Sequence, residues 1–272
     1  ALGLLTSGAG NVSVGSGSLG ALTTGLYNTA LGTNALGTNV DGDSNTAIGY
    51  QSMKTFEAAS DGDGANTAVG YYSLQALTNG QLNTAVGMRA GDVLTTGDDN
   101  AFFGSDAGGA ATTASGSTFI GASSGKTVTT GNRNIAIGYD AMTGGTTTGD
   151  NNIAIGTSAG DALTSGYENV AIGKDALTGG TTIVQAVCIG NLAGASIGSG
   201  TDSNGSVLIG GNAGRVMSDG RYNTLIGWSS GYENATGNYG LLTGDSNTAV
   251  GYETLGASAA ANLTGNHNTV MG

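Results

Sequence analysis

Three segments of the sequence match the pattern Gly-x-Ser-x-Gly, at residues 121–125, 156–160 and 227–231. A serine nucleophile in this pattern needs a strand-to-helix turn, a histidine base and an acid. The chain has a single histidine, His267, and all three matches occupy the same place in a repeat. Repetition explains them, and we expect no catalytic residues and no enzyme.

A second glycine pattern, Gly15-x-Gly17-x-x-Gly20, matches the dinucleotide-binding fingerprint. That fingerprint binds a pyrophosphate only when it opens a helix inside a βαβ unit, with an acidic residue further along the chain. No helical pattern follows here, and the glycines again belong to the repeat. We therefore expect no cofactor.

Two acidic segments, Asp41-Gly42-Asp43 and Asp61 to Gly64, resemble calcium loops in composition. They lack the nine-residue period of calcium β-rolls and the distant glutamate of an EF-hand. The expected role is that of turn residues and no metal site is predicted, with a structural Ca²⁺ as the alternative. The only cysteine, Cys188, stands where other copies carry Ala or Leu, which indicates packing.

Four longer spacings between repeats, at 54–64, 195–204, 232–245 and 257–266, predict loops expelled from one corner of the fold. Aromatic side chains beside Asn and Asp suit the faces of carbohydrates, and the alternative, which the sequence favours, is that they fill a local gap. Tyr50, Tyr71, Tyr139 and Tyr252 share one position of the repeat and are interpreted as a spaced ladder. The candidate ligand-binding residues are Phe56, Asp61, Asp63, Trp228, Tyr232, Asn238 and Tyr239.

The elements that would position these residues follow from an internal repeat. A five-residue unit such as Asn45-Thr46-Ala47-Ile48-Gly49 recurs along the whole chain, and most copies are 17 residues apart. The closing glycines are Gly15, Gly32, Gly49, Gly70, Gly87, Gly104, Gly121, Gly138, Gly156, Gly173, Gly190, Gly210, Gly227, Gly251 and Gly272.

A unit of this length is too short for helical repeats, and its period-2 alternation with β-branched residues predicts short strands separated by turns. We predict an all-β fold: a parallel β-solenoid of about 17 residues per coil. Residues 1–272 are expected to form a single repeat array, cut from a longer fibre protein because the first residues begin inside a unit.

The two faces of the expected strand are both apolar. The residue before each closing glycine is large and is predicted to fill the coil interior. The residue before that one is Ala in most copies, and a strand covered on both sides needs a second layer. A homotrimer would supply it, with these predicted interface residues: Ala47, Ala68, Ala85, Phe102, Phe119, Ala136, Ala154, Ala171, Leu208 and Leu225.

Asn opens the unit in twelve of the fifteen copies, the exceptions being Ser117, Ala186 and Ser206. In stacked coils identical residues lie above one another, so we expect amide ladders that satisfy side-chain donors and acceptors.

Composition narrows the function classes. The chain has 53 Gly and no Pro, which excludes collagen, and its 6% aromatic residues leave too few bulky side chains for a thick globular core. A net charge of −12 disfavours nucleic acid and anionic membranes as partners. No apolar run is long enough to span a membrane.

The sequence Asn-Thr-Ala-Ile/Val-Gly-Tyr-x-Ala/Ser-Leu/Met, at residues 45–53, 66–74 and 247–255, resembles the repeat of phage tail-fibre-like proteins and bacterial surface fibres. It is also similar to the head repeats of trimeric autotransporter adhesins, whose strands build a trimeric β-roll, although the coil here is longer. This resemblance implies a structural shaft or adhesin module of a trimeric fibre, outside the cell, on a cell surface or on a virion.

The expected partners are further copies of the chain and a cell-surface glycan or host receptor. Two other readings stay open. Repeated Thr ranks on a flat sheet could order water, as in an ice-binding solenoid, although Ile and Val interrupt the rank. A tailspike-like helix that binds or degrades polysaccharide would need clustered carboxylates, whereas the acids here are scattered through turns.

Overall fold

The computed structural model describes the chain except residues 60–62, 199–203, 218–219, 232–242 and 256–263. It confirms the predicted fold class: a parallel β-solenoid of about 14 coils with about 17 residues per turn. None of the described residues lies in a helix. The chain divides into two compact units, residues 1–133 and 134–272.

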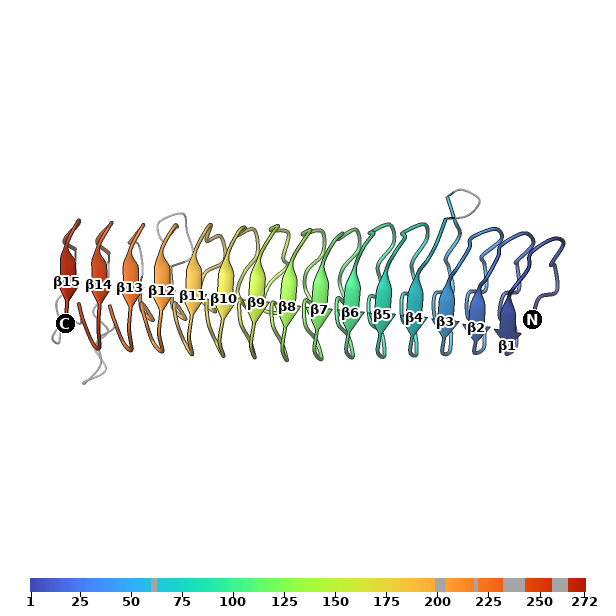
Figure 1. Cartoon of the computed structure of the whole chain (residues 1–272), viewed down its shortest axis with the longest axis horizontal. Helices are drawn as coiled ribbons and strands as arrows, with labels where there is room; N and C mark the ends of the chain where they lie inside the picture. The colour runs from blue at the N-terminus through green and yellow to red at the C-terminus, as the bar shows by residue number, and fades with distance from the viewer. Residues whose placement is uncertain (60–62, 199–203, 218–219, 232–242, 256–263) are drawn as a thin grey trace. The chain divides into compact units, whose positions relative to one another are not determined.

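Each coil contributes one strand of three residues (Figure 1). Within each unit neighbouring strands run parallel in chain order, with equivalent residues side by side, as in Thr46↔Thr67, Ala47↔Ala68 and Ile48↔Val69. The first unit contains β1 (Val12–Val14), β2 (Thr29–Leu31), β3 (Thr46–Ile48), β4 (Thr67–Val69), β5 (Thr84–Val86), β6 (Ala101–Phe103) and β7 (Thr118–Ile120). The second contains β8 (Ile135–Ile137), β9 (Ile153–Ile155), β10 (Val170–Ile172), β11 (Val187–Ile189), β12 (Val207–Ile209), β13 (Thr224–Ile226), β14 (Thr248–Val250) and β15 (Thr269–Met271).

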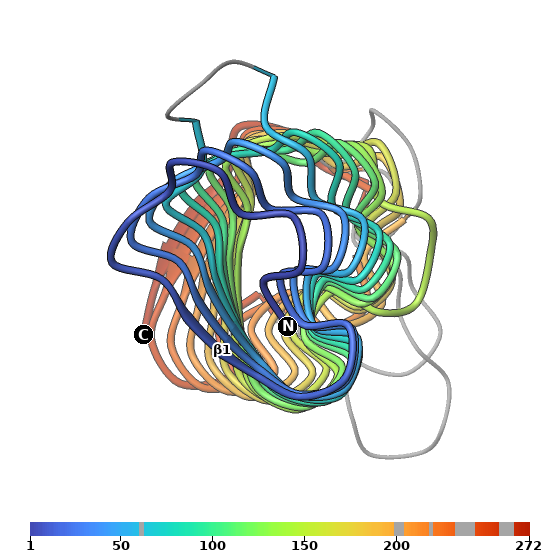
Figure 2. The same ribbon diagram turned by 90° about the vertical axis from the view of Figure 1, so that its right-hand side faces the viewer.

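Within each unit the backbones of successive coils follow one another around the turns (Figure 2). Hydrogen bonding between coils continues beyond the strands into the turn that follows the closing glycine. Gln51 and Met53 have positive φ, of 52° and 50°, and Ser52 between them does not. The Gln51 amide donates to the preceding coil, at Thr33 (2.9 Å), whereas the Met53 amide donates to the following coil, at Ser73 (2.9 Å). The backbone therefore bonds to both neighbours even where no strand exists.

The closing glycine is required by close approach of the coils. Gly49 has φ of 131°, a region that side-chain-bearing residues avoid, and a Cβ there would collide with the carbonyl group of Gly70 in the next coil. The same collision recurs at the closing glycines from Gly15 to Gly104 and from Gly138 to Gly251, which accounts for the regular glycine of the sequence.

The two faces of the strand are reversed relative to the prediction. The middle residue points into the coil, and every predicted trimer-interface residue is fully buried within its own chain: Ala47, Ala68, Ala85, Phe102, Phe119, Ala136, Ala154, Ala171, Leu208 and Leu225. The residue before the closing glycine, such as Ile48 or Val69, faces outward and is half-exposed. Assignment of the ten buried residues to a trimer interface is therefore wrong, because a partner cannot reach them.

Side-chain size inside the coil is balanced between the middle strand residue and the residue six positions later. Small strand residues face a large partner, as in Ala68 with Leu74, whereas Phe102 faces Gly108. A Cβ on Gly108 would lie 3.0 Å from the Phe102 ring. The remaining pairs follow the same rule except two, which are Ala85–Gly91 and Ala154–Gly160. The space beside Gly91 is filled from the neighbouring coils by Leu74 and Phe102.

This balance predicts a rescue between two destabilising substitutions. Phe102→Ala should lower the free energy of unfolding by about 3–5 kcal/mol by leaving a cavity, and Gly108→Leu by about 1–3 kcal/mol by overpacking. The double variant recreates the Ala68–Leu74 arrangement and should recover at least about half of the summed loss. Urea denaturation followed by circular dichroism measures all four proteins. Strictly additive losses would contradict the size-balance rule.

The predicted asparagine ladder is present and buried. Asn83 is 1% exposed; its backbone amide donates to Asn66 Oδ1 (2.9 Å), and its Nδ2 donates to the same oxygen (3.2 Å) and to the Gly97 carbonyl (2.8 Å). Asn83 Oδ1 in turn accepts from the backbone amide and Nδ2 of Asn100 (3.1 and 2.9 Å). One side chain thus joins three coils and ties the strand start to the opposite turn.

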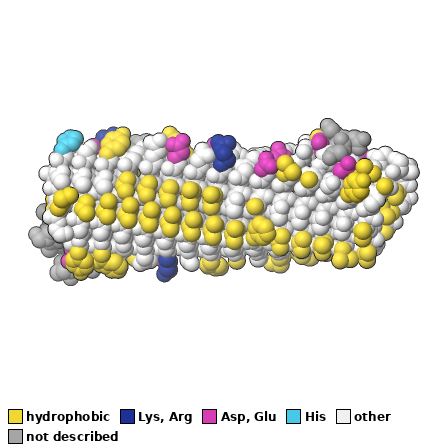
Figure 3. Space-filling view, viewed as in Figure 1, with side chains coloured by type: hydrophobic (Ala, Val, Ile, Leu, Met, Phe, Trp, Pro, Cys, Tyr) yellow, Lys and Arg dark blue, Asp and Glu magenta, His cyan; other side chains and the backbone are white. Residues whose placement is uncertain are grey.

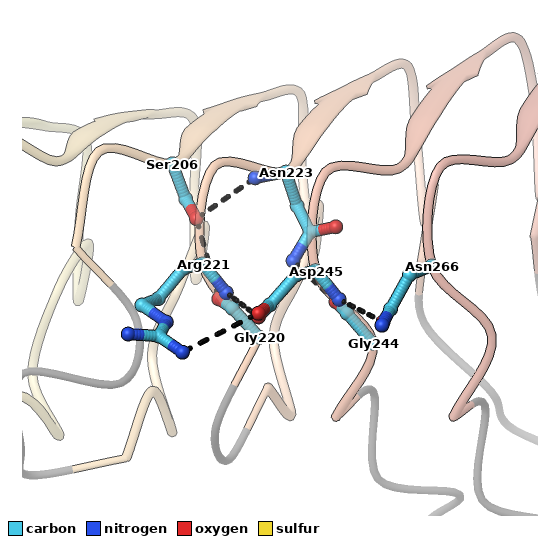
Figure 4. Close-up of polar contacts among 7 residues, drawn as sticks. All are labelled: Ser206, Gly220, Arg221, Asn223, Gly244, Asp245 and Asn266. Atoms are coloured by element: carbon cyan, nitrogen blue, oxygen red, sulfur yellow. Dashed lines mark hydrogen bonds and ion pairs between the residues drawn. The ribbon is translucent and has the colours of Figure 1, made fainter.

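Figure 4 shows how the ladder tolerates a substitution in the second unit. Where Ser206 replaces Asn, its Oγ still accepts from the Asn223 amide (3.2 Å), and Asn223 Nδ2 resumes the bond to the Gly244 carbonyl (2.9 Å). A second, more exposed ladder lies alongside: Asp245 Oδ1 accepts from the Arg221 amide (2.8 Å), and Asn266 Oδ1 accepts from the Asp245 amide (2.7 Å).

Removing one amide from the middle of the ladder should be costly. Asn83→Ala leaves the Gly97 carbonyl and the Asn100 amide buried without their partner, and should lower the free energy of unfolding by about 2–4 kcal/mol. Asn79→Ala, at an exposed position of the same coil, is the matched control and should change it by less than about 0.5 kcal/mol. Equal effects in urea denaturation would contradict a structural role for the ladder.

Candidate functional site

The outward face of the strands is a regular surface in each unit. It carries two ranks of side chains, from the first and third residues of every strand, and most of them are half-exposed. In the first unit the first rank is mainly Thr, as at Thr46, Thr67 and Thr84. In Figure 3 hydrophobic side chains form rows that cross successive coils on this face.

The outward face of the second unit is apolar in both ranks from β8 to β12. Ile135, Ile153, Val170, Val187 and Val207 form the first rank. Beside it runs a second rank made of Ile137, Ile155, Ile172, Ile189 and Ile209. Contiguous exposed apolar surfaces are uncommon on soluble monomers and mark interaction surfaces. We call these ten residues the isoleucine face.

A second candidate surface is a cluster of three tyrosines on the turn after β3 and β4. The Tyr50 and Tyr71 rings lie on consecutive coils with centroids 5.5 Å apart and planes within 14°. The Tyr72 ring is 4.0 Å from that of Tyr71 and 5.5 Å from that of Tyr50. Tyr50 and Tyr71 are 41% and 47% exposed, so the cluster is open to solvent.

Polar side chains surround the tyrosines. Gln51 Nε2 donates to the Tyr50 hydroxyl (3.0 Å), and Gln75 Nε2 donates to Gln51 Oε1 (3.0 Å). On the next coil Arg89 is held by Asp92 (2.9 Å) and lies 3.6 Å from Asp106. These two carboxylates raise the pKa of Arg89, so its guanidinium is a fixed cation beside the cluster. We call the three tyrosines with Gln51, Gln75 and Arg89 the tyrosine corner.

The predicted ligand-binding residues do not converge. Phe56 is fully buried beside Gly42, so its assignment to an exposed binding loop is wrong: it fills the core position that Leu77 and Leu94 fill in later coils. Asp63 acts through its backbone, since its carbonyl accepts from the Asp43 amide (3.1 Å). Four further candidates lie outside the described residues: Asp61, Tyr232, Asn238 and Tyr239.

Of the two candidate ligand-binding aromatics in the described part of the chain, Phe56 and Trp228, Trp228 is exposed, at 53%. Its indole lies over Gly211, one coil earlier in the same position of the repeat, where a Cβ would collide with the ring. Tyr222 lies over Gly205 in the same way. A glycine one coil before an exposed aromatic therefore lets the ring lie flat on the surface.

The serines of the motifs that suggest chemistry all occupy one position of the repeat. Ser123, Ser158 and Ser229 of the Gly-x-Ser-x-Gly segments occupy the left-handed turn position, with φ of 57°, 54° and 54°. Among the described residues no group of three or more His, Cys, Asp or Glu side chains could hold a metal ion. Burial raises the pKa of the Cys188 thiol to about 12, which keeps it protonated and unreactive.

Comparison with known proteins does not assign the chain to a family. No protein-family model and no curated protein matches the chain. In the described part of the chain no helix has the length and apolar character needed to cross a membrane.

The sequence-based interpretation of Tyr50 and Tyr71 as a ladder fits their stacking, but it missed the cluster. The sequence feature that could have predicted the cluster is the adjacent pair Tyr71-Tyr72. Tyr72 has a left-handed backbone conformation (φ 59°), and its ring lies against that of Tyr71. Gln51 and Gln75 lie on adjacent coils, and their side chains are in contact although they are 24 residues apart in the sequence.

Contact among the phenol groups can be tested by titration. A hydrogen bond with Tyr71 raises the pKa of Tyr72 from 10.0 to about 12, with smaller contributions from burial and from Tyr50. Tyr71→Phe removes that bond and should bring the pKa of Tyr72 back toward 10.0, as measured by ¹³C NMR of labelled tyrosine rings against pH. Tyr139→Phe, at the same position of the repeat, should leave it unchanged.

Proposed function

We propose that the chain is a structural module of an extracellular or virion fibre that associates with further copies of itself through the isoleucine face. The observation that carries this proposal is the double apolar rank on the outward side of β8 to β12. An exposed surface of this kind is stabilised when another apolar surface removes it from water. The resemblance of the repeat to trimeric fibre proteins supports three copies.

The interface proposed here differs from the one expected from the sequence. The Ala and Phe positions serve the interior of each coil, and the Ile and Val positions remain for contact between chains. Flat ranks of β-branched side chains pack well against a second sheet about 10 Å away. Three symmetric copies could each turn this face toward a common threefold axis.

Mass in solution tests this proposal. The wild-type chain should sediment at three times its 26.3 kDa mass, whereas Ile155→Lys with Ile172→Lys should sediment as a monomer, because buried lysines are costly in an apolar interface. Tyr167→Lys, at an exposed turn, is the control and should remain associated. Circular dichroism checks that each variant is folded. A monomeric wild-type protein would refute self-association.

Ice binding is the second candidate function, favoured by the outward Thr rank of the first unit. Thr29, Thr46, Thr67 and Thr84 are half-exposed and repeat at the strand spacing of about 4.8 Å, beside an apolar rank. Thermal hysteresis from a monomeric protein, lost in Thr67→Tyr, would favour this function. An associated protein without thermal hysteresis would leave the fibre module as the better account.

A further inference from the structure

We propose that the tyrosine corner binds a neutral, extended oligosaccharide of β-1,4-linked hexopyranoses. This inference rests on the proposed function, because a fibre module that contributes to surface recognition needs a ligand site. It uses residues on the turn after the strand, whereas self-association uses the outward side chains of the strands. The two can therefore fail separately.

The first argument is the exposed aromatic surface. Tyr50 and Tyr71 are 41% and 47% exposed, so a large part of each side chain is open to a ligand. Aromatic rings combine an apolar face with a polar hydroxyl, which suits a sugar ring with its C–H face and its rim of hydroxyl groups. A purely aliphatic partner would use the apolar faces of these rings but not their hydroxyl groups.

The second argument is unused hydrogen-bonding capacity. Each glutamine amide has two N–H donors and two acceptor lone pairs on its oxygen, and the bonds of Gln51 and Gln75 described above occupy only part of them. Arg89 adds further donors, since its contact with Asp92 is made through Nε. Vicinal sugar hydroxyls pair with groups that both donate and accept, as these amides do.

The scaffold fixes these groups in place. The Tyr72 amide donates to the Tyr50 carbonyl (3.1 Å), and the Arg89 amide donates to the Tyr71 carbonyl (2.8 Å). The side chains thus stand on three successive coils that are bonded to one another, and little conformational entropy is lost on binding.

The direction and charge of the corner select the ligand. Its residues follow the stacking direction of the coils, so a straight glycan chain can contact several of them, whereas a helical one cannot. The charge of Arg89 is balanced by Asp92 and Asp106, and the chain carries a net charge of −12. Acidic glycans would be repelled, which leaves a neutral chain.

Isothermal titration calorimetry with cellohexaose, chitohexaose and maltohexaose tests the inference. Cellohexaose or chitohexaose should bind, and the helical α-1,4-linked maltohexaose should not. Tyr71→Ala should raise Kd about tenfold or more, because it removes the ring shared by both other tyrosines. Gln75→Ala should raise Kd by about threefold to tenfold through lost hydrogen bonds.

Tyr139→Ala is the matched control: this tyrosine has the same position in the repeat and is exposed, but no ring contact involves it among the described residues. It should bind as the wild type does. Absence of binding to both β-1,4-linked hexaoses, or an unchanged Kd in Tyr71→Ala, would overturn the inference. Binding by a monomeric protein would refute the proposed self-association and leave the glycan site standing.

Discussion

The stacking of coils at the spacing of a parallel sheet is the constraint on which the rest of this structure depends. Each coil has only three strand residues, so strands alone would not hold it. The buried asparagine side chain supplies the missing connection, because its amide joins the coils before and after it and reaches across to a turn carbonyl. A buried amide is costly when unpaired, which makes correct register a condition of stability.

Stacking also explains why the sizes of core side chains are matched between neighbouring coils. Equivalent residues lie in contact on adjacent coils, as the Phe102 and Phe119 rings do at 5.0 Å, so a large side chain affects its neighbours as well as its own coil. The glycines at positions 108 and 125 make room for those rings, and Gly91 admits Leu74 and Phe102 from either side. The interior is thin, but it is well packed because side chains that face each other have complementary sizes.

The period of the sequence was sufficient to predict the fold class, the short strands and the asparagine ladder, because each follows from what a repeated residue must contact. Which face is buried could not be read from alternation alone, since both faces of the strand are apolar and a period of two does not distinguish inside from outside. The pairing of Phe102 with Gly108 and of Ala68 with Leu74 carried that information. Phe56 was misplaced because its coil has a longer spacing, yet it fills an ordinary core position.

Departures from the repeat are where specific recognition can arise. A uniform coil offers the same turn along its whole length, and an isolated tyrosine such as Tyr139 presents one ring only. In the site that we propose, Tyr72 and the two glutamines bring hydroxyl and amide groups to a pair of stacked rings. The isoleucine face, in contrast, gains its character from uniformity, because identical ranks extend an apolar surface. Regular coils thus suit assembly, and irregular ones suit selective binding.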